Sequence, residues 1–203
     1  GLKPAQKWRT IDNGSELYVK KITSNKNIIF KLNTEVVRVD RVKKKCIVNF
    51  SNGQKNEFDH VVFAISPTII KTIINNQTPS EKKIFSKFKI SKNKAVLHSD
   101  TKLMPRLKTV WSSWNFVQTG SGNFKDDPPG VIYWMNRLQG IDQQHPFFVS
   151  LNPIDNINDS KIYYETEYNH PQFDIETVEA QKEIKKIQGH KGIWYTGAWL
   201  GNG

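Results

Sequence analysis

Apolar and polar residues alternate along much of the first half of the chain, as they do in half-buried strands. Alternation at 34–41 and at 45–51 predicts two strands, and Asn52-Gly53 directly after them predicts a tight hairpin turn. The run 58–65 is almost continuously apolar, which is typical of a strand buried on both faces. These three segments predict a meander of three strands.

A helix pattern precedes the meander. Ser15 is of the residue type that caps helix N-termini, and the apolar residues Leu17, Val19 and Ile22 follow it. The pattern predicts a helix that starts after Ser15 and turns these three side chains toward a core.

Three further helices are expected, at 68–74, 79–87 and 175–187. Ser80 is placed to cap the second of them. In the third, Val178, Ile184 and Ile187 are expected to face inward, whereas the lysines of this helix point outward.

The second half of the chain predicts longer strands with aromatic faces. They are expected at 95–100, 109–117, 130–136, 147–151 and 162–168. A loop at 119–129, rich in glycine, aspartate and proline, joins the second of these strands to the third. The whole pattern predicts an α+β fold, in which a mixed or antiparallel sheet carries peripheral helices beside a partial meander.

Composition narrows the class of protein. A length of 203 residues suits one domain or a large part of a two-domain enzyme, and 11% aromatic residues predict an aromatic-rich core. No apolar run approaches the length of a membrane span, and no N-terminal segment has the pattern of an export signal. The single cysteine, Cys46, excludes an internal disulfide, which suits a reducing, cytoplasmic compartment. It lies in a strand pattern, where it is expected to be a small core residue.

The formal net charge of +11 favours anionic partners in general. The tightest basic run, Lys43-Lys44-Lys45, lies between two expected strands, where a solvated hairpin turn explains it. A basic, tryptophan-rich and β-rich chain keeps a nucleic-acid-binding module as an alternative, but the tryptophans are flanked by Ser, Asn and Val instead of the cations that stacking platforms need. We therefore expect no nucleic acid partner, and peripheral contact with an anionic membrane stays open.

A glycine-rich stretch ends the chain. A β-prone run at 192–195 leads into Gly197, Ala198 and Gly201, and small residues after a strand let backbone N–H groups approach a bulky anionic ligand. No helix follows to add its dipole, and no methionine begins the chain. We interpret the chain as a partial segment that carries part of a cofactor site.

Several specific combinations of residues resemble flavin-dependent amine-oxidase-like oxidoreductases, most of all the bacterial branch of predicted NAD/FAD-binding proteins. The resemblance extends over essentially the whole chain. It rests on Trp8-Arg9-Thr10, Phe58 to Ala64, Val96 to Asp100, Trp111 to Asn115, Tyr133 to Gln139, Ser150 to Pro153 and Trp194 to Gly201.

The resemblance implies three segments: a partial FAD-domain segment at 1–66, a substrate-binding α+β domain at 67–188, and a return to the FAD domain at 189–203. The family holds the FAD pyrophosphate on a G-x-G-x-x-G loop before a helix. Here Gly120-Ser121-Gly122 precedes acidic and proline residues that cannot open such a helix. The full-length protein is therefore expected to bind FAD. This chain alone is expected to lack FAD and activity, with the missing remainder of its own chain as a partner.

The resemblance also implies cofactor contacts. Backbone groups of Val36 or Val37 would meet the adenine, and Ala64 would lie beside the cofactor where the buried strand ends. The flavin and pyrophosphate would be bordered by Gly197, Ala198, Trp199 and Gly201. For the two valines and Ala64, a place in the strand core is the alternative.

In this family the flavin accepts the hydride, while the protein orients the substrate and excludes water. Aromatic side chains suit that task, and those available are Trp111, Trp114, Tyr133 and Trp134. The alternative is that they form the core of the sheet. Because Trp111 and Trp114 are three residues apart in an expected strand, they point to opposite faces, so at most one lines a given cavity.

Polar residues within these strands are candidates for catalysis. Asn115 and Asn136 lie in apolar surroundings, so each amide must bond backbone, water or ligand. His98 and Asp100 share a strand face and could form an acid/base pair, with a paired structural role as the alternative. A metal site at this pair lacks an evident third ligand. Related amine oxidases hold a water near the flavin with a lysine, and Arg106 or Lys108 lies in a comparable region.

The sequence thus predicts a fragment of an FAD-dependent oxidoreductase that oxidises a small amine or an acyl-lipid substrate by hydride transfer to flavin. Two alternatives stay beside it. One is a non-catalytic remnant that does not bind FAD, and the other is the basic nucleic-acid-binding module.

Overall fold

The computed structural model describes residues 9–12, 14–118 and 129–201, which form two compact units. Unit 1 contains residues 1–29 and 92–168, and unit 2 contains residues 30–91 and 169–203. The boundaries expected at 66 and 188 do not coincide with the boundaries between the units, and the roles given to the three expected segments stay predictions.

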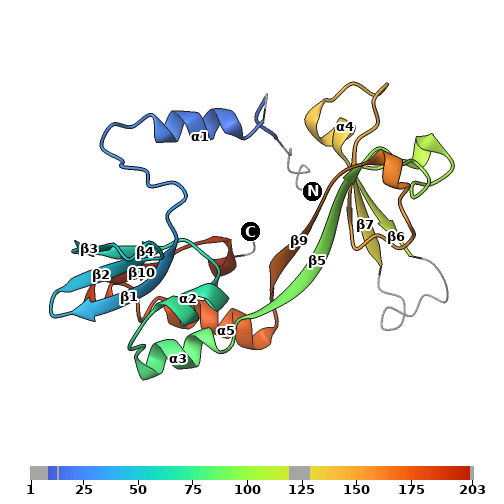
Figure 1. Cartoon of the computed structure of the whole chain (residues 1–203). Coiled ribbons are helices and arrows are strands. Elements are labelled where there is room, and N and C mark those ends of the chain that lie inside the picture. Colours follow the sequence, from blue (N-terminus) through green and yellow to red (C-terminus); the bar gives the residue numbers. More distant parts are fainter. Residues whose placement is uncertain (1–8, 13, 119–128, 202–203) are drawn as a thin grey trace, which may run out of the picture. The chain divides into compact units, whose positions relative to one another are not determined.

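Unit 2 contains two small sheets (Figure 1). An antiparallel meander is formed, in this order, by β1 (Val36–Val42), β2 (Lys45–Phe50) and β3 (Lys55–Phe58). The second sheet is a parallel pair, β4 (Val61–Phe63) and β10 (Ile193–Tyr195). The hairpin turn expected at Asn52-Gly53 is present, and Gly53 takes a φ of +82° that favours glycine.

The single buried strand expected at 58–65 is wrong. The meander's third strand ends at Phe58, and the apolar run after it pairs with β10 instead of with β2. The two segments approach closely, because a Cβ added at Gly192 would lie 2.7 Å from the carbonyl oxygen of Asp59. Val62 is 60% exposed, so β4 is not buried on both faces.

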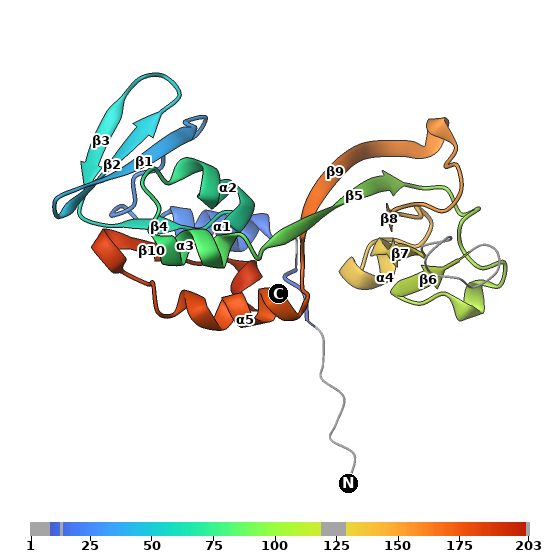
Figure 2. The same ribbon diagram turned by 90° about the horizontal axis from the view of Figure 1, so that it is seen from below.

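Three helices complete unit 2, and α3 packs against both of the others (Figure 2). They are α2 (Pro67–Ile73), α3 (Pro79–Phe85) and α5 (Ile175–Ile184). The N-cap of α3 is Thr78, whose hydroxyl accepts a bond from the N–H of Glu81 while the Glu81 carboxylate accepts one from the N–H of Thr78. Ser80, the expected cap, lies inside the helix.

Helix α5 buries Ile184 as expected, and Ile187 beyond its end is buried too, but Val178 is not. Its buried residues are Thr177, Ala180 and Ile184, whereas Val178 is 41% exposed. The capping residue Asp174 accepts bonds from both the N–H and the hydroxyl of Thr177, and that hydroxyl also donates to the carbonyl of Lys87. These bonds turn Thr177 inward, and Val178 follows it to the outside.

The core of unit 2 contains more aliphatic than aromatic side chains, so the aromatic-rich core that the composition predicts is not found here, although several aromatic rings pack within it. Tyr195 lies edge-on to Phe85 at 5.1 Å between ring centroids. Its hydroxyl donates to the Glu81 carboxylate at 2.5 Å, and Glu81 also pairs with the guanidinium of Arg41. Because these residues belong to β10, α3 and β1, the buried network ties the three elements together.

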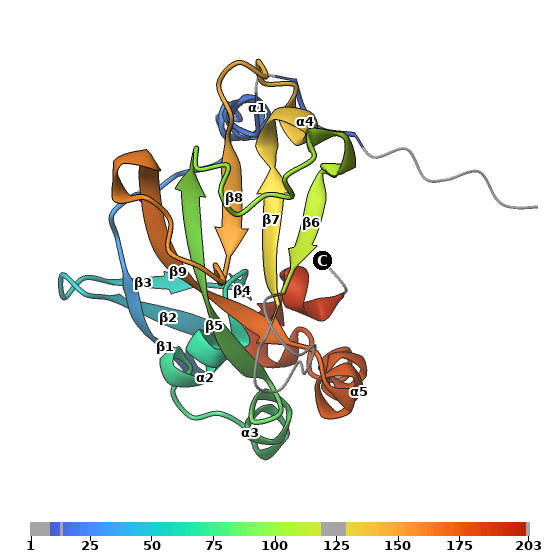
Figure 3. The same cartoon turned by 90° about the vertical axis from the view of Figure 1, so that its right-hand side faces the viewer.

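Unit 1 is built on one five-stranded sheet, whose strands lie side by side in the order β6-β7-β8-β5-β9 (Figure 3). The strands are β5 (Lys89–His98), β6 (Trp114–Val117), β7 (Gly130–Trp134), β8 (Phe148–Leu151) and β9 (Ile162–Gln172), of which residues 89–91 and 169–172 belong to unit 2. The pairs of β6 with β7, β7 with β8 and β5 with β8 are antiparallel. Together with the parallel pair of unit 2, this sheet confirms the α+β fold with mixed and antiparallel sheets.

Two of the expected strands of unit 1 are shorter than the patterns predict. The strand expected at 109–117 begins only at Trp114, behind the short helix η1 (Lys108–Val110). The strand expected at 130–136 ends at Trp134, where α4 (Met135–Gln139) begins. Other 3-10 turns are η2 (Asp159–Lys161), η3 (His190–Gly192) and η4 (Ala198–Leu200). Residues 119–128 of the expected loop lie outside the described residues.

The two faces of this sheet differ. The inner face packs on the core of unit 1, and its side chains include His98, Asn115, Trp134 and Phe148. The outer face carries Trp114, Phe116 and Tyr133, because residues two apart and residues paired across antiparallel strands share a face. Trp114 is 54% exposed and Phe116 is 73% exposed, so this face is largely open.

Helix α1 (Glu16–Thr23) begins after Ser15 as expected, but none of its residues is buried. Leu17, Val19 and Ile22, which the pattern turns toward a core, are exposed. The expectation of a core-facing side is therefore wrong within the described residues. None of the helices in the described part of the chain has the length and apolar character that a membrane span requires.

Candidate functional site

The carboxyl ends of β4 and β10 lie next to each other at one edge of the parallel pair. The N–H of Thr196 donates to the carbonyl of Phe63 at 2.8 Å, and the indole N–H of Trp199 donates to the carbonyl of Ile65 at 3.0 Å. The small residues expected to border a cofactor are exposed here, namely Ala64, Gly197, Ala198 and Gly201. Ligands of open parallel sheets bind at this kind of edge.

Gly197 is required by the turn that follows β10. Its φ is +140°, and an added Cβ would lie 2.7 Å from the indole nitrogen of Trp199. Trp199 is itself buried, edge-on to Phe88 at 5.0 Å between ring centroids. Its side chain therefore supports the turn from the core side, and only its neighbours present backbone at the edge.

The amide of Gln181 on α5 holds the same turn from the other side, through bonds to the carbonyls of Trp199 and Gly201 at 2.8 and 3.2 Å. Around Gly201 there is open space, since an added Cβ would meet nothing within 4 Å. The turn is thus fixed by the side chains of Trp199 and Gln181 and is open toward solvent.

Val36 and Val37 lie at the start of β1, where the strand is irregular. Val36 pairs with Phe50 and Arg38 pairs with Asn49, so the register shifts across Val37. A β-bulge of this kind leaves one residue without a ladder partner and occurs often beside binding sites. Val37 is also 46% exposed, so the alternative of a place in the strand core does not fit it.

His98 is fully buried on the inner face of the five-stranded sheet. Its Nδ1 accepts a bond from the N–H of Asp100 at 3.1 Å, which leaves the proton on Nε2 for the 2.8 Å bond to the hydroxyl of Ser150. Burial lowers the pKa of His98, and the nearby charge of Asp100 only partly opposes that effect. The imidazole is thus a neutral group engaged within the sheet.

Asp100 does not bond the His98 ring with its carboxylate. Burial would raise the pKa of this carboxyl, but the N–H groups of Asn158 and Lys102 and the ammonium of Lys161 lower it below its usual value. The imidazole and the carboxylate therefore have separate side-chain partners and are linked only through the backbone N–H of Asp100, so the geometry matches the structural alternative better than an acid/base pair.

The amides of Asn115 and Asn136 bond to backbone, one of the three partners considered for them. Asn115 exchanges two bonds with Ser112 and donates a third to the carbonyl of Ile132. Asn136 donates to the carbonyls of Asp142 and His145 and accepts from the N–H of Phe147, each at 2.7 Å. A catalytic role for either amide stays a prediction that these bonds do not support.

The four aromatic candidates divide between the two sides of the sheet, although Trp111 precedes β6 and the strand spacing does not apply to it. Trp111 lies edge-on to Trp134 at 5.3 Å between ring centroids, and both belong to the core side. Trp114 lies edge-on to Tyr133 at 6.1 Å on the outer face. Only this second pair is placed to meet a ligand. Lys108 is exposed, with its ammonium 5.8 Å from the Trp111 ring centroid.

A cavity of about 690 Å³ opens beside Trp114 within unit 1, a volume in the range of small-molecule sites. Its lining includes Arg9, Arg137, Met135 and Leu138, none of which was a candidate. Arg9 and Arg137 lie within the segments that carry the family resemblance, but nothing in the sequence showed that they line one cavity, because the helix α4 was not expected.

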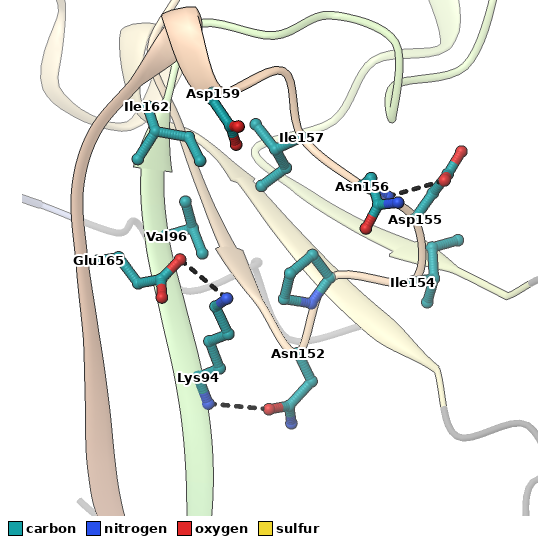
Figure 4. Close-up of a pocket in the computed structure, with 11 residues that line it drawn as sticks. Lys94, Val96, Asn152, Ile154, Asp155, Asn156, Ile157, Asp159, Ile162 and Glu165 are labelled. Carbon is teal, nitrogen blue, oxygen red and sulfur yellow. Dashed lines mark hydrogen bonds and ion pairs between the residues drawn. The ribbon is translucent and has the colours of Figure 1, made fainter.

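A second cavity of about 550 Å³ lies between β5, β9 and the segment 152–159 (Figure 4). Three of its four charged lining residues form ion pairs. Lys94 pairs with Glu165 at 2.8 Å, and Asp155 pairs with Lys102 at 2.9 Å. Among the described residues there is no group of three or more His, Cys, Asp or Glu that could hold a metal ion. We therefore regard the cavity beside Trp114 as the better candidate.

Comparison with protein families matches residues 5–113 to the flavin containing amine oxidoreductase family. That segment covers more than half of the chain. Comparison with curated proteins gives no match.

Solved structures share the fold at low sequence identity. A CLA-producing fatty acid isomerase from P. acnes has a TM-score of 0.62 at 12% identity, over 91% of this chain and 47% of that one. A putrescine oxidase mutant from a redesign of cofactor binding has a TM-score of 0.58 at 9% identity, over 91% and 47%. Reduced UDP-galactopyranose mutase has a TM-score of 0.51 at 12% identity, over 85% and 42%. The chain spans less than half the length of each of these structures.

Proposed function

Because this chain belongs to the flavin containing amine oxidoreductase family, we propose that it supplies two parts of an FAD-dependent oxidoreductase. Unit 2 contributes one edge of the cofactor site, and unit 1 contributes the substrate-binding sheet. The reaction is oxidation of a small amine or an acyl lipid by hydride transfer to flavin. The remainder of the polypeptide supplies the phosphate-binding loop.

The observation that carries this proposal is the edge at the carboxyl ends of β4 and β10. Four small exposed residues gather there, and the turn at Gly197 has no room for a side chain. Such an edge lets a ligand approach the backbone closely, as a dinucleotide requires. The bulge at Val37 adds backbone groups outside the ladder, which suits hydrogen bonds to an adenine ring.

Bound flavin would supply the hydride acceptor. The residues of this chain have other tasks in the proposal. Ala64, Gly197 and Gly201 admit the cofactor, while Trp114 and Tyr133 on the outer face of the sheet orient the substrate and exclude water. The buried groups of the inner face, His98 among them, keep the sheet in shape.

The test uses the complete native polypeptide and its Gly201→Leu variant. Because a side chain at Gly201 would extend into open space, the variant is expected to fold like the wild type and to lose bound flavin. Visible absorbance of the purified protein measures flavin content, and thermal melting of the apoprotein checks the fold. The control is Ser86→Leu, at an exposed residue on the C-terminal side of α3.

Two results would contradict the proposal. One is a complete wild-type polypeptide that contains no flavin and takes none up from added FAD. The other is a Gly201→Leu variant that retains as much flavin as the Ser86→Leu control.

A further inference from the structure

The cavity beside Trp114 is positively charged. Two of its lining residues, Arg9 and Arg137, are exposed cations, and no carboxylate of a described residue lines it. The guanidinium of Arg137 is held in place by a 3.2 Å bond to the carbonyl of Trp111. This one bond leaves most of the five N–H donors of an arginine unused by described residues.

The cavity of Figure 4 offers a useful contrast within the same unit. There, the ammonium of Lys94 meets the carboxylate of Glu165, so the positive charge is neutralised inside the fold. No described carboxylate pairs with Arg9 or Arg137 in this way. Two arginines facing one cavity without a carboxylate repel each other and attract an anion, and their planar forks match a carboxylate or phosphate.

Apolar surface adjoins these two charges. Met135 and Leu138 of α4 line the cavity together with Trp114. From Trp114 the outer face continues to Tyr133, its cross-strand partner, and to Phe116, which is 73% exposed. A cationic cavity thus leads onto an exposed aromatic strip, an arrangement that suits a molecule with an anionic head and an apolar tail.

We propose that this cavity binds the head group of an anionic amphiphile, with its tail along Trp114, Tyr133 and Phe116. The inference rests on the proposed function, because it names the class of substrate that binds to the sheet of unit 1. Of the two classes left open, it selects the acyl lipid over the small amine. A protonated amine would meet two like charges and no carboxylate here, which disfavours it.

The test is isothermal titration calorimetry on this chain with three ligands that share a ten-carbon tail: decanoate, decyl phosphate and decylammonium, each below its micelle concentration. We expect the better of the two anions to bind at least about tenfold more tightly than the cation, given the cost of like-charge contacts. Comparison of the two anions identifies the head group that the cavity prefers.

Three variants locate the site. Arg9→Gln and Arg137→Gln are each expected to weaken anion binding by about fivefold or more, the size of a partly exposed charge-assisted contact. Arg137→Lys, which keeps the charge but not the planar fork, is expected to fall between Arg137→Gln and the wild type. The matched control is Arg106→Gln, an exposed arginine of the same unit that does not line the cavity. Circular dichroism checks that each variant keeps the wild-type fold.

The proposal is overturned by equal or tighter binding of decylammonium. It is equally overturned if Arg106→Gln weakens anion binding as much as Arg9→Gln does, because net charge alone would then explain the affinity. Flavin content of the complete polypeptide separates the two proposals. Anion preference without flavin contradicts the oxidoreductase alone, and flavin binding with amine preference contradicts the anionic head group alone.

Discussion

The two faces of the five-stranded sheet carry the same kinds of residue, but on one face these residues are buried and on the other they are exposed. On the inner face, Trp134 and His98 are buried, and the polar groups find their partners within the fold. On the outer face, Trp114 and Phe116 remain exposed beside a cation-lined cavity. The difference teaches that residue type does not distinguish a core position from a ligand-binding position, whereas the side of the strand on which the residue lies does.

The largest expected effect separates two tryptophans of the same sheet. Trp134→Ala should lower the free energy of unfolding of unit 1 by about 3–5 kcal/mol, because it empties a buried site in the core. Trp114→Ala should cost about 1 kcal/mol or less, because that side chain is 54% exposed. Urea denaturation of both variants measures the difference. Equal losses would remove the distinction between the faces.

A smaller effect is expected for a polar group of the inner side. Asn136→Ala should cost roughly 2–3 kcal/mol, because two carbonyls and one N–H lose their partner in a half-buried loop. Gln139→Ala, at an exposed position of the same helix, is the matched control and should stay within about 0.5 kcal/mol of the wild type. Thermal melting is the measurement. If Asn136→Ala melts like the control, the amide is not a structural anchor.

The smallest effect concerns pH. Burial holds the pKa of His98 below its ordinary value of 6.5, so the unfolded chain binds more protons than the folded one as the pH falls. Stability contributed by the neutral ring is present above pH 6.5 and declines as the pH falls below it. Asp100, whose pKa is also lowered, adds a second loss only below its ordinary pKa of 3.8. The His98→Gln variant should therefore show a flatter melting temperature between pH 7 and pH 5 than the wild type. If the melting temperature of the variant depends on pH as steeply as that of the wild type, a group other than His98 titrates in this range.

The pattern of apolar and polar residues predicted most of the helices and strands, but few of the pairings between them. The first two strands of the meander, the hairpin turn at Asn52-Gly53 and the turn after β10 follow from alternation and from glycine placement, whereas the third strand, β3, was not expected where it lies. The division of the run 58–65 does not, because the pairing of β4 with a strand that lies far along the chain decides it. The cap at Thr78 was missed because Ser80 and Thr78 are both capping residues, and only the register of α3 selects between them.

The candidate site shows the same limit. Small residues at 197–201 indicated a cofactor edge, and the structure brings them beside Ala64. Trp199, expected to border the flavin, packs in the core instead because its indole bonds the carbonyl of Ile65. Arg9 and Arg137 were not candidates, since residues so far apart in the sequence meet at one cavity only after the chain has folded.

The sequence by itself determined the family, the α+β class and the kinds of side chain available for chemistry. These follow from local spacing and from residue combinations, which the chain carries before it folds. Only the tertiary structure decided which face of each strand is covered. It therefore also decided which aromatic and polar residues stabilise the fold. Burial is a property of the packed elements together, so a tryptophan or an asparagine acquires its role from neighbours that are distant in sequence.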